Sequence, residues 1–238
     1  MAAAGGLDFL YIREPGSSIT IRRTLAEGNA GNQIKNFRGP FLIENSIIVG
    51  NCGFFEGQPF TFNVDNCRAQ GDALALGLMA GDHLTVTNNT FTSEGDCLVT
   101  AECDDVSCSG SESVLLRNNI FVGQVDFMQP FENTCLVYQE TFPSDPFDID
   151  YSVITNTKDT PPCPGAHDQC GVAPGLVSTA IDSFNAHLVT GSPTINAGTS
   201  SGAPLDDFDG RLRDALPDIG AYEWRPPAAW IYLPVIRR

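Results

Sequence analysis

Short runs in which apolar and polar residues alternate recur through the middle of the chain, separated by asparagine-rich corners. Three segments align without gaps: FNVDNCRAQGDALAL from Phe62, VTNNTFTSEGDCLVT from Val86 and LRNNIFVGQVDFMQP from Leu116. Alternation with a period of two predicts β-strands, and a repeat of this length predicts a solenoid whose units bury their apolar faces against one another. Because no helical periodicity separates the runs, the pattern predicts an all-β fold, a parallel β-helix.

Neighbouring segments extend the repeat in both directions. SITIRRTLA aligns with GPFLIENSIIVGN, which places Ile21 with Ile43 and Arg23 with Asn45. Further along, FDIDYSVITN resembles one more rung, with Tyr151 in the corner position. We therefore expect rungs on both sides of the clearest repeat.

The pattern divides the chain into three parts. Rungs are expected over residues 1–160, with further rungs preceding residue 1, because GGLDFLYI already resembles the middle of a rung. The non-repetitive residues 161–224 are expected to form an atypical cap over the last rung, since a solenoid end exposes apolar surface and a strand edge. Residues 225–238 follow as a proline-rich spacer and an apolar tail. An exposed first rung predicts a dimer through that end.

The corners are rich in asparagine. Asn88–Asn89 and Asn118–Asn119 occupy equivalent places in successive rungs. Stacked asparagine side chains can hydrogen-bond in a ladder along a solenoid, an arrangement related to that of cross-β fibrils. We interpret these residues as structural.

The charge of the chain excludes some partners. Its formal net charge is −16, which argues against binding to nucleic acid or to an anionic membrane. The sequence lacks the long apolar run that a membrane-spanning helix needs, so it predicts no transmembrane segment. A neutral glycan or a divalent cation such as calcium is the partner that this charge favours.

Eight cysteines form an even set, which favours an oxidised, exported protein. Their spacing suggests a disulfide between Cys163 and Cys170 and another between Cys52 and Cys67, and it leaves the other four unassigned. The N-terminus, MAAAGGLDF, lacks the basic and apolar regions of a signal peptide. We therefore expect a secreted or cell-surface protein whose export signal is missing from this sequence.

Three segments near the C-terminus carry a more specific resemblance: GSPTINAG at 191–198, DDFDGRLR at 206–213 and DIGAYEW at 218–224. Together they resemble the C-terminal signature of bacterial surface proteins called choice-of-anchor Q. The resemblance implies a right-handed parallel β-helix of the pectin-lyase type, export, and anchoring at the cell surface. It implies no particular reaction, because one fold hosts many functions.

The gapless alignment places Asp72, Asp96 and Asp126 at one position of three successive rungs. Parallel strands lie about 4.8 Å apart, so neighbouring carboxylates would raise one another's pKa, and glycosidases act through two carboxyl groups. A lyase would need carboxylates that bind calcium and a basic residue, for which Arg68 and Lys158 are the candidates. The alternative is that Gly71–Asp72 and Gly95–Asp96 are solvent-facing turn residues.

The segment EGDCLVT also resembles the Asp-Cys motif of polygalacturonases. The chain has one aspartate there instead of two, and it lacks the Gly-His-Gly and Arg-Ile-Lys motifs of those enzymes. Polygalacturonase activity is therefore not predicted.

One further acidic group could bind a metal. Asp206, Asp207 and Asp209 bring carboxylates together beside a turn glycine, which is the material of a calcium site. The segment lacks the distal glutamate of an EF-hand. We therefore favour the alternative that Asp207 or Asp209 pairs with Arg211 or Arg213 within the chain.

Three functions remain open. The β-helix could bind a glycan or another surface component without turnover, which is the interpretation we favour. It could be a carbohydrate-active enzyme, a polysaccharide lyase or a glycoside hydrolase, that uses Asp72, Asp96 and Asp126. It could also be a passive stalk. Aromatic residues that line a groove beside the aspartates would favour the first two. Aspartates open to bulk water, without a groove, would favour the stalk.

Overall fold

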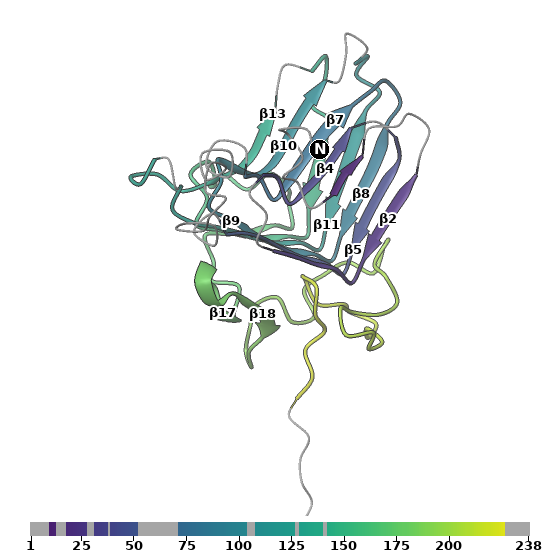
Figure 1. Cartoon of the computed structure of the whole chain (residues 1–238). Coiled ribbons are helices and arrows are strands. Elements are labelled where there is room, and N and C mark those ends of the chain that lie inside the picture. Colours follow the sequence, from purple (N-terminus) through teal and green to yellow (C-terminus); the bar gives the residue numbers. More distant parts are fainter. Residues whose placement is uncertain are drawn as a thin grey trace, which may run out of the picture.

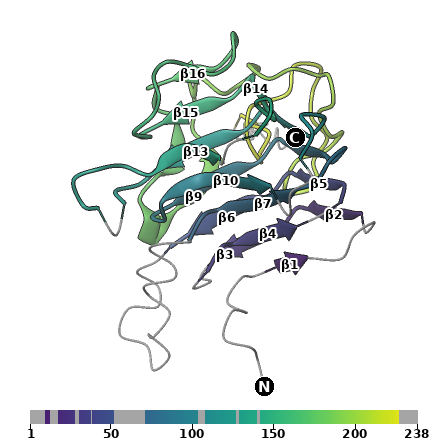
Figure 2. The ribbon, with the colours of Figure 1, turned by 90° about the horizontal axis from the view of Figure 1, so that it is seen from above.

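The computed structural model describes residues 10–12, 18–27, 31–37, 39–51, 71–103, 108–126, 129–139 and 142–226. These residues form a parallel β-helix with three parallel sheets along its sides (Figure 1). The predicted all-β solenoid is therefore confirmed. The rungs stack from β1, β2 and β3 at one end to β14, β15 and β16 at the other (Figure 2).

Each sheet takes one strand from each rung. Sheet A contains β1 (Leu10–Ile12), β4 (Ile34–Phe37), β7 (Leu74–Leu78), β10 (Cys97–Cys103) and β13 (Cys135–Gln139). Sheet B contains β2 (Ile19–Arg22), β5 (Phe41–Glu44), β8 (His83–Thr87), β11 (Ser113–Arg117) and β14 (Phe147–Asp150). Sheet C contains β3 (Leu25–Glu27), β6 (Ile47–Gly50), β9 (Thr90–Ser93), β12 (Ile120–Gly123), β15 (Val153–Thr155) and β16 (Gln169–Cys170).

The strand register confirms most of the predicted repeat. Leu116 pairs with Val86, as the alignment of their two segments predicted, and Ile21 pairs with Ile43. The additional rung is also present, because Leu116 pairs with Ile149.

The predicted alignment of the first two segments is wrong where the structure describes it. Leu74 pairs with Val99 rather than with the predicted Leu98, so Asp72 lies level with Cys97 rather than with Asp96. The gapless alignment assumed corners of constant length, whereas insertions in a solenoid fall at its corners and move the register of the next strand. The first part of that segment, 62–70, lies outside the described residues.

The corner between sheets B and C has one backbone geometry in every rung. Its first residue has a positive φ of 49°–55°, and this residue is Arg23, Asn45, Asn88, Asn118 or Tyr151. Asparagine is favoured there because its short polar side chain tolerates the left-handed conformation better than most residues. The equivalences predicted for Arg23 with Asn45 and for Tyr151 with Asn118 are confirmed.

The second residue of this corner forms the predicted ladder. Asn89 Oδ1 accepts a hydrogen bond from Ser46 N at 2.8 Å, and Asn119 Oδ1 accepts one from Asn89 N at 2.9 Å. Ser152 Oγ continues the ladder by accepting from Asn119 N at 3.2 Å. These side chains are buried, so the ladder satisfies backbone groups that water cannot reach.

The C-terminal region departs from the expected cap. After the loop at 157–170, which lies at the last rung, β17 (Leu176–Ser178), a 3₁₀ turn (Ile181–Ser183) and β18 (Asn185–Leu188) form a hairpin. This hairpin lies beneath sheet C in Figure 1. Residues 194–224, which we call the strap, then run along the corner between sheets B and C as far as the first rung, where Asp206 pairs with Arg22. They return over the outside of sheet C, where Ile219 packs with Ile120.

The amino-acid pattern of sheet C explains this course. Consecutive residues of its strands are buried, so both faces of the sheet are covered. Ile48, Phe91, Phe121 and Ile154 fill the interior, where the two phenylalanine rings stack at 5.2 Å. On the outside, Ile120 packs with Ile219. Burial of this second apolar face stabilises the strap in its side-on position.

Three disulfides lie within the described residues. The predicted Cys163–Cys170 bond is confirmed. Two further bonds join Cys97 to Cys135 and Cys103 to Cys108, while the predicted pair Cys52 and Cys67 lies outside the described residues. In the part of the chain that the structure describes, no helix has the length and apolar character needed to cross a membrane.

Candidate functional site

The corner that leads from sheet C into sheet A carries a carboxylate in successive rungs. Asp72 precedes β7, Asp96 precedes β10, Asp126 follows β12, and Asp159 follows β15. We call these four residues the acidic corner. The structure thus gathers the three aspartates predicted from the repeat and adds a fourth.

Asp72 is held in the sheet by two hydrogen bonds. Its Oδ1 accepts from Cys97 N at 3.1 Å, and its Oδ2 accepts from Thr100 Oγ1 at 3.0 Å. Burial nevertheless raises the pKa of the Asp72 carboxyl to about 7, and the charge of Asp96 adds to this effect. At neutral pH this carboxyl is therefore a balanced proton donor and acceptor, a property typical of general acids and bases.

Asp96 and Asp126 form a carboxyl pair. Partial burial raises the pKa of Asp96, and the charge of Asp126 and a hydrogen bond between the two side chains raise it further. Asp126 is fully buried, and its Oδ1 accepts from Gln129 N at 3.1 Å. The two carboxyl groups are therefore close enough for Asp126 to raise the pKa of Asp96.

A cationic side chain lies close to this pair. Lys158 lowers the pKa of Asp96 through its charge, and its Nζ lies 3.5 Å from Glu132 Oε2. Lys158 belongs to the chain that follows β15 and Glu132 to the loop that precedes β13. Charges from two rungs therefore meet at this corner.

One row of side chains crosses all five strands of sheet A beside the acidic corner. The strand pairing aligns five residues in the order Tyr11, Lys35, Ala75, Thr100 and Tyr138. At about 4.8 Å per strand, four spacings separate the two tyrosines by about 19 Å. We call these five residues the outer row.

The ends of the outer row are open to solvent. Tyr11 is 46% exposed and Tyr138 is 57% exposed. Lys35 Nζ lies 5.5 Å from the centroid of the Tyr11 ring. Because Thr100 donates to Asp72, the outer row and the acidic corner are in direct contact.

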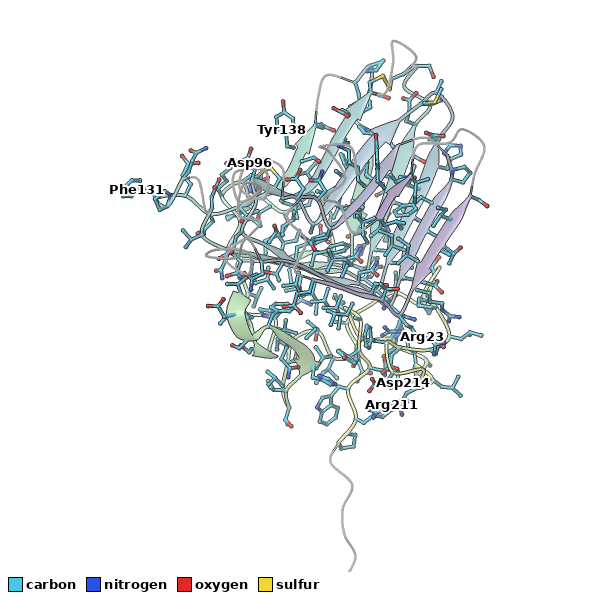
Figure 3. The ribbon with its side chains drawn as sticks, in the orientation of Figure 1. Arg23, Asp96, Phe131, Tyr138, Arg211 and Asp214 are labelled. Atoms are coloured by element: carbon cyan, nitrogen blue, oxygen red, sulfur yellow. A yellow bond between two sulfur atoms is a disulfide. The ribbon has the colours of Figure 1, made fainter. Side chains whose placement is uncertain are left out.

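A loop with an exposed aromatic tip projects beside the corner. Phe131 is 99% exposed, and Figure 3 shows it far out at the same edge of the molecule as Asp96 and Tyr138. The base of the loop is closed by a bridge between Val125 and Asn133. An exposed aromatic side chain therefore lies at the same edge of the molecule as Asp96.

A cavity of about 510 Å³ lies at the end of the last rung. Its lining combines apolar side chains with acidic ones, and one of these, Asp159, connects it to the acidic corner. The apolar residues are Leu136, Val137, Phe147 and Ile149, and the acidic ones are Asp145, Asp148, Asp150 and Asp159. Asp159 itself accepts a hydrogen bond from Leu136 N at 2.8 Å. The cavity is therefore continuous with the candidate site at its C-terminal end.

The aspartates predicted as calcium ligands have protein partners instead. Asp206 pairs with Arg22 and Arg23 of the first rung, and Asp209 pairs with Arg211 at 3.3 Å. Asp207 is buried, where it accepts from the backbone of Arg211 at 2.8 Å. Among the described residues, no group of three histidine, cysteine, aspartate or glutamate side chains is arranged to hold a metal ion.

The residues of the C-terminal signature form a buried network around Arg213. The Arg213 and Glu223 side chains, each 2% exposed, form an ion pair at 3.1 Å. The guanidinium also donates to the carbonyl oxygens of Asp206, Asp218, Gly220 and Ala221 and to Asn45 Oδ1. These motifs therefore hold the strap in shape, and their arrangement assigns them no chemistry.

Sequence reasoning missed the outer row, and Arg68, the proposed base, lies outside the described residues. The spacing in sequence between successive members of the row, Tyr11, Lys35, Ala75, Thr100 and Tyr138, differs at every step. No fixed period finds such a row. Alternation within each short strand was the only available signal.

Comparison with known proteins adds no assignment to this geometry. No protein-family model matches the chain, and no curated protein sequence matches it.

Proposed function

We propose that this chain is an exported surface protein of the choice-of-anchor Q type that binds an extended glycan across the outer face of sheet A, without turnover. The outer row is the observation that carries the proposal. It places two exposed tyrosines about 19 Å apart, with a lysine and a threonine between them. The three disulfides support an oxidising, extracellular location.

The chemistry of the row suits a sugar chain. Aromatic rings offer a flat apolar surface with a polar tip, against which the carbon–hydrogen face of a pyranose can pack. Thr100 and Lys35 supply hydroxyl and ammonium groups for sugar hydroxyls. The strongly negative chain favours a neutral glycan over an acidic one on this face.

The test compares two aromatic substitutions. Hexasaccharides of β-1,4-linked glucose, xylose and mannose would be titrated calorimetrically into the wild type, Tyr138→Ala and Phe131→Ala. We expect at least one glycan to bind and Tyr138→Ala to weaken it about tenfold or more, the scale of a lost aromatic contact. Phe131→Ala, which removes an exposed ring outside the row, is the control and should retain most of the affinity.

Two outcomes would overturn this proposal. Equal losses in the two variants would remove the outer row as the determinant of binding. Absence of binding to all three glycans, with no turnover either, would leave the β-helix as a stalk that spaces other parts of a longer protein.

A second candidate function rests on the carboxyl groups. Burial and Asp126 raise the pKa of Asp96, and burial raises the pKa of Asp72 to about 7. A carboxyl group with a raised pKa beside a second carboxyl group is what glycoside hydrolases use for acid–base catalysis. Turnover would be followed by new reducing ends and by the absorbance of unsaturated uronic products. Loss of turnover in Asp96→Asn would place the active site at the acidic corner, whereas unchanged turnover would exclude that location.

A further inference from the structure

A second hollow lies far from sheet A, between the C-terminal hairpin and the end of the strap. It has a volume of about 390 Å³ and is lined by 187–190, Arg211 and 222–225. We call it the strap groove. We propose that it binds the carboxylate of an acidic sugar, a uronic acid or a sialic acid, independently of the glycan proposed for the outer row.

An aromatic stack forms one part of the groove. The rings of His187 and Tyr222 are parallel to within 20° with centroids 3.9 Å apart, and Phe208 supports Tyr222 at 5.2 Å. Burial raises the pKa of the Tyr222 hydroxyl to about 12, and the charges of Asp209 and Asp207 reinforce this. Tyr222 therefore keeps its proton at neutral pH and remains a hydrogen-bond donor.

The hydrogen bonds around His187 define its tautomer. Asn185 Oδ1 lies 3.1 Å from His187 N and 2.8 Å from His187 Nδ1. The backbone N–H can only donate, so the asparagine atom is an acceptor, and Nδ1 must carry the proton. Nε2 is then left to interact with a ligand.

Two guanidinium groups line the same groove. The Arg211 side chain is 58% exposed, and its ion pair with Asp209 is a surface pair, which contributes little and can be exchanged for a ligand carboxylate. Arg225 donates one N–H to the carbonyl oxygen of Leu212 and has further donors, because a guanidinium carries five. Glu223, the acidic residue in the lining, is occupied by the buried Arg213.

This combination fits a carboxylated sugar. Two arginines line the groove, and its one acidic lining residue, Glu223, is paired with Arg213. The groove therefore offers guanidinium groups to an anion on a chain whose net charge is −16. Guanidinium groups bind carboxylates in a bidentate, charge-assisted manner, and the adjoining rings offer a surface for the sugar ring.

The test uses two acidic tetrasaccharides, one from hyaluronan and one of galacturonate, together with sialyllactose. The neutral comparison is each compound with its carboxylates reduced to hydroxymethyl groups. Calorimetric titration should show binding of at least one acidic compound and binding at least about tenfold weaker for its reduced form, since a charge-assisted pair contributes roughly a factor of ten or more.

Substitutions locate the binding. Arg211→Gln with Arg225→Gln should abolish binding of the acidic compound, and each single change should weaken it about tenfold. Arg23→Gln is the control: it removes the same charge from an exposed arginine outside the groove and should leave the affinity unchanged. Tyr138→Ala should also leave it unchanged, which separates this site from the outer row.

Three results would overturn the proposal. These are no binding of any acidic compound by the wild type, equal binding of the reduced compounds, and full binding by the folded double variant. Thermal unfolding of the double variant verifies its fold, and the two single variants decide the question if it does not fold.

Discussion

Two corners of the same β-helix contain stacked polar side chains. They differ in which hydrogen-bond partners those side chains find. At the corner between sheets B and C, the inner residues bond along the ladder and the outer asparagines bond to the strap. Asn45, Asn88 and Asn118 donate to the carbonyl oxygens of Asp206, Asp218 and Thr199, at 2.6, 3.0 and 2.8 Å. At the acidic corner, by contrast, carboxyl groups face one another and two of them have raised pKa values.

The difference shows which polar repeats hold a solenoid together and which oppose its stability. An asparagine has both donors and acceptors, so a column of asparagines satisfies itself and its neighbours. A column of aspartates has acceptors only and repels itself unless protons or cations intervene. Because a column of aspartates costs stability, its presence marks a candidate functional site.

The largest effect should come from the strap. Arg213→Ala would leave Glu223 buried without its partner and would remove the donors of several carbonyl oxygens, so we expect the free energy of unfolding to fall by about 3–5 kcal/mol. Arg211→Ala, two positions away and exposed, should cost no more than about 1 kcal/mol. Chemical denaturation measures both, and equal effects would show that the Arg213 network does not hold the strap.

The next effect concerns Asp72 and pH. Its folded pKa of about 7 lies above the ordinary value of 3.8, so the folded state binds more protons between these values and stability falls as pH rises from about 4 to about 7. Asp72→Asn should remove most of this decline, which corresponds to at most roughly 4 kcal/mol. Denaturation at a series of pH values tests this, and an unchanged slope in the variant would contradict the raised pKa.

Asn119→Ala tests the ladder. The substitution leaves the backbone N–H of Asn89 and the carbonyl oxygen of Val86 without their partners, at 2.9 and 2.8 Å in the folded protein. Loss of hydrogen bonds from buried backbone groups should lower the free energy of unfolding by about 2–3 kcal/mol. Hydrogen exchange should show faster exchange of the Asn89 amide, and protection at the wild-type level would contradict the role of the ladder.

The smallest effect has the opposite sign. Asp96→Asn removes a charge beside Asp126, so at pH 8 we expect a gain in stability of up to about 1 kcal/mol, limited by solvent screening of this exposed side chain. The gain should vanish at acid pH, where Asp96, whose pKa is raised, is uncharged in the wild type as well. A loss of stability at pH 8 would mean that Asp96 contributes to the fold and would weaken the comparison between the two corners.

The fold was predictable because it depends on local patterns. Period-two alternation and the asparagine corners are visible in single segments, so Val86 could be aligned with Leu116 and Ile21 with Ile43 from the sequence. Cys163 and Cys170 lie close in sequence, and their pairing was predicted for that reason.

The site was less predictable because it depends on relations between rungs. Corners of different length moved Asp72 out of level with Asp96, and unequal spacing in sequence hid the alignment of Lys35, Ala75 and Thr100. The course of the strap was missed for a related reason. The strands of sheet C are runs of consecutive apolar residues, which indicate that both faces of the sheet are buried. Such a run does not show which segment covers the second face, because a strand inside a core has the same pattern.

The strap also affects the order in which the parts of the molecule can fold. In a simple solenoid each rung contacts only its neighbours, so folding can proceed from the first rung as soon as a few rungs exist. Here Arg22 of the first rung is paired with Asp206, 184 residues later, and the strap crosses the rungs between them. During synthesis the rung that contains Arg22 can form early, but its pairing with the strap waits until the chain has emerged as far as Asp206. The strap thus links rungs that would otherwise contact only their neighbours, and it makes their unfolding more cooperative. The contacts that stabilise the rung of Arg22 form late in folding, when the strap docks.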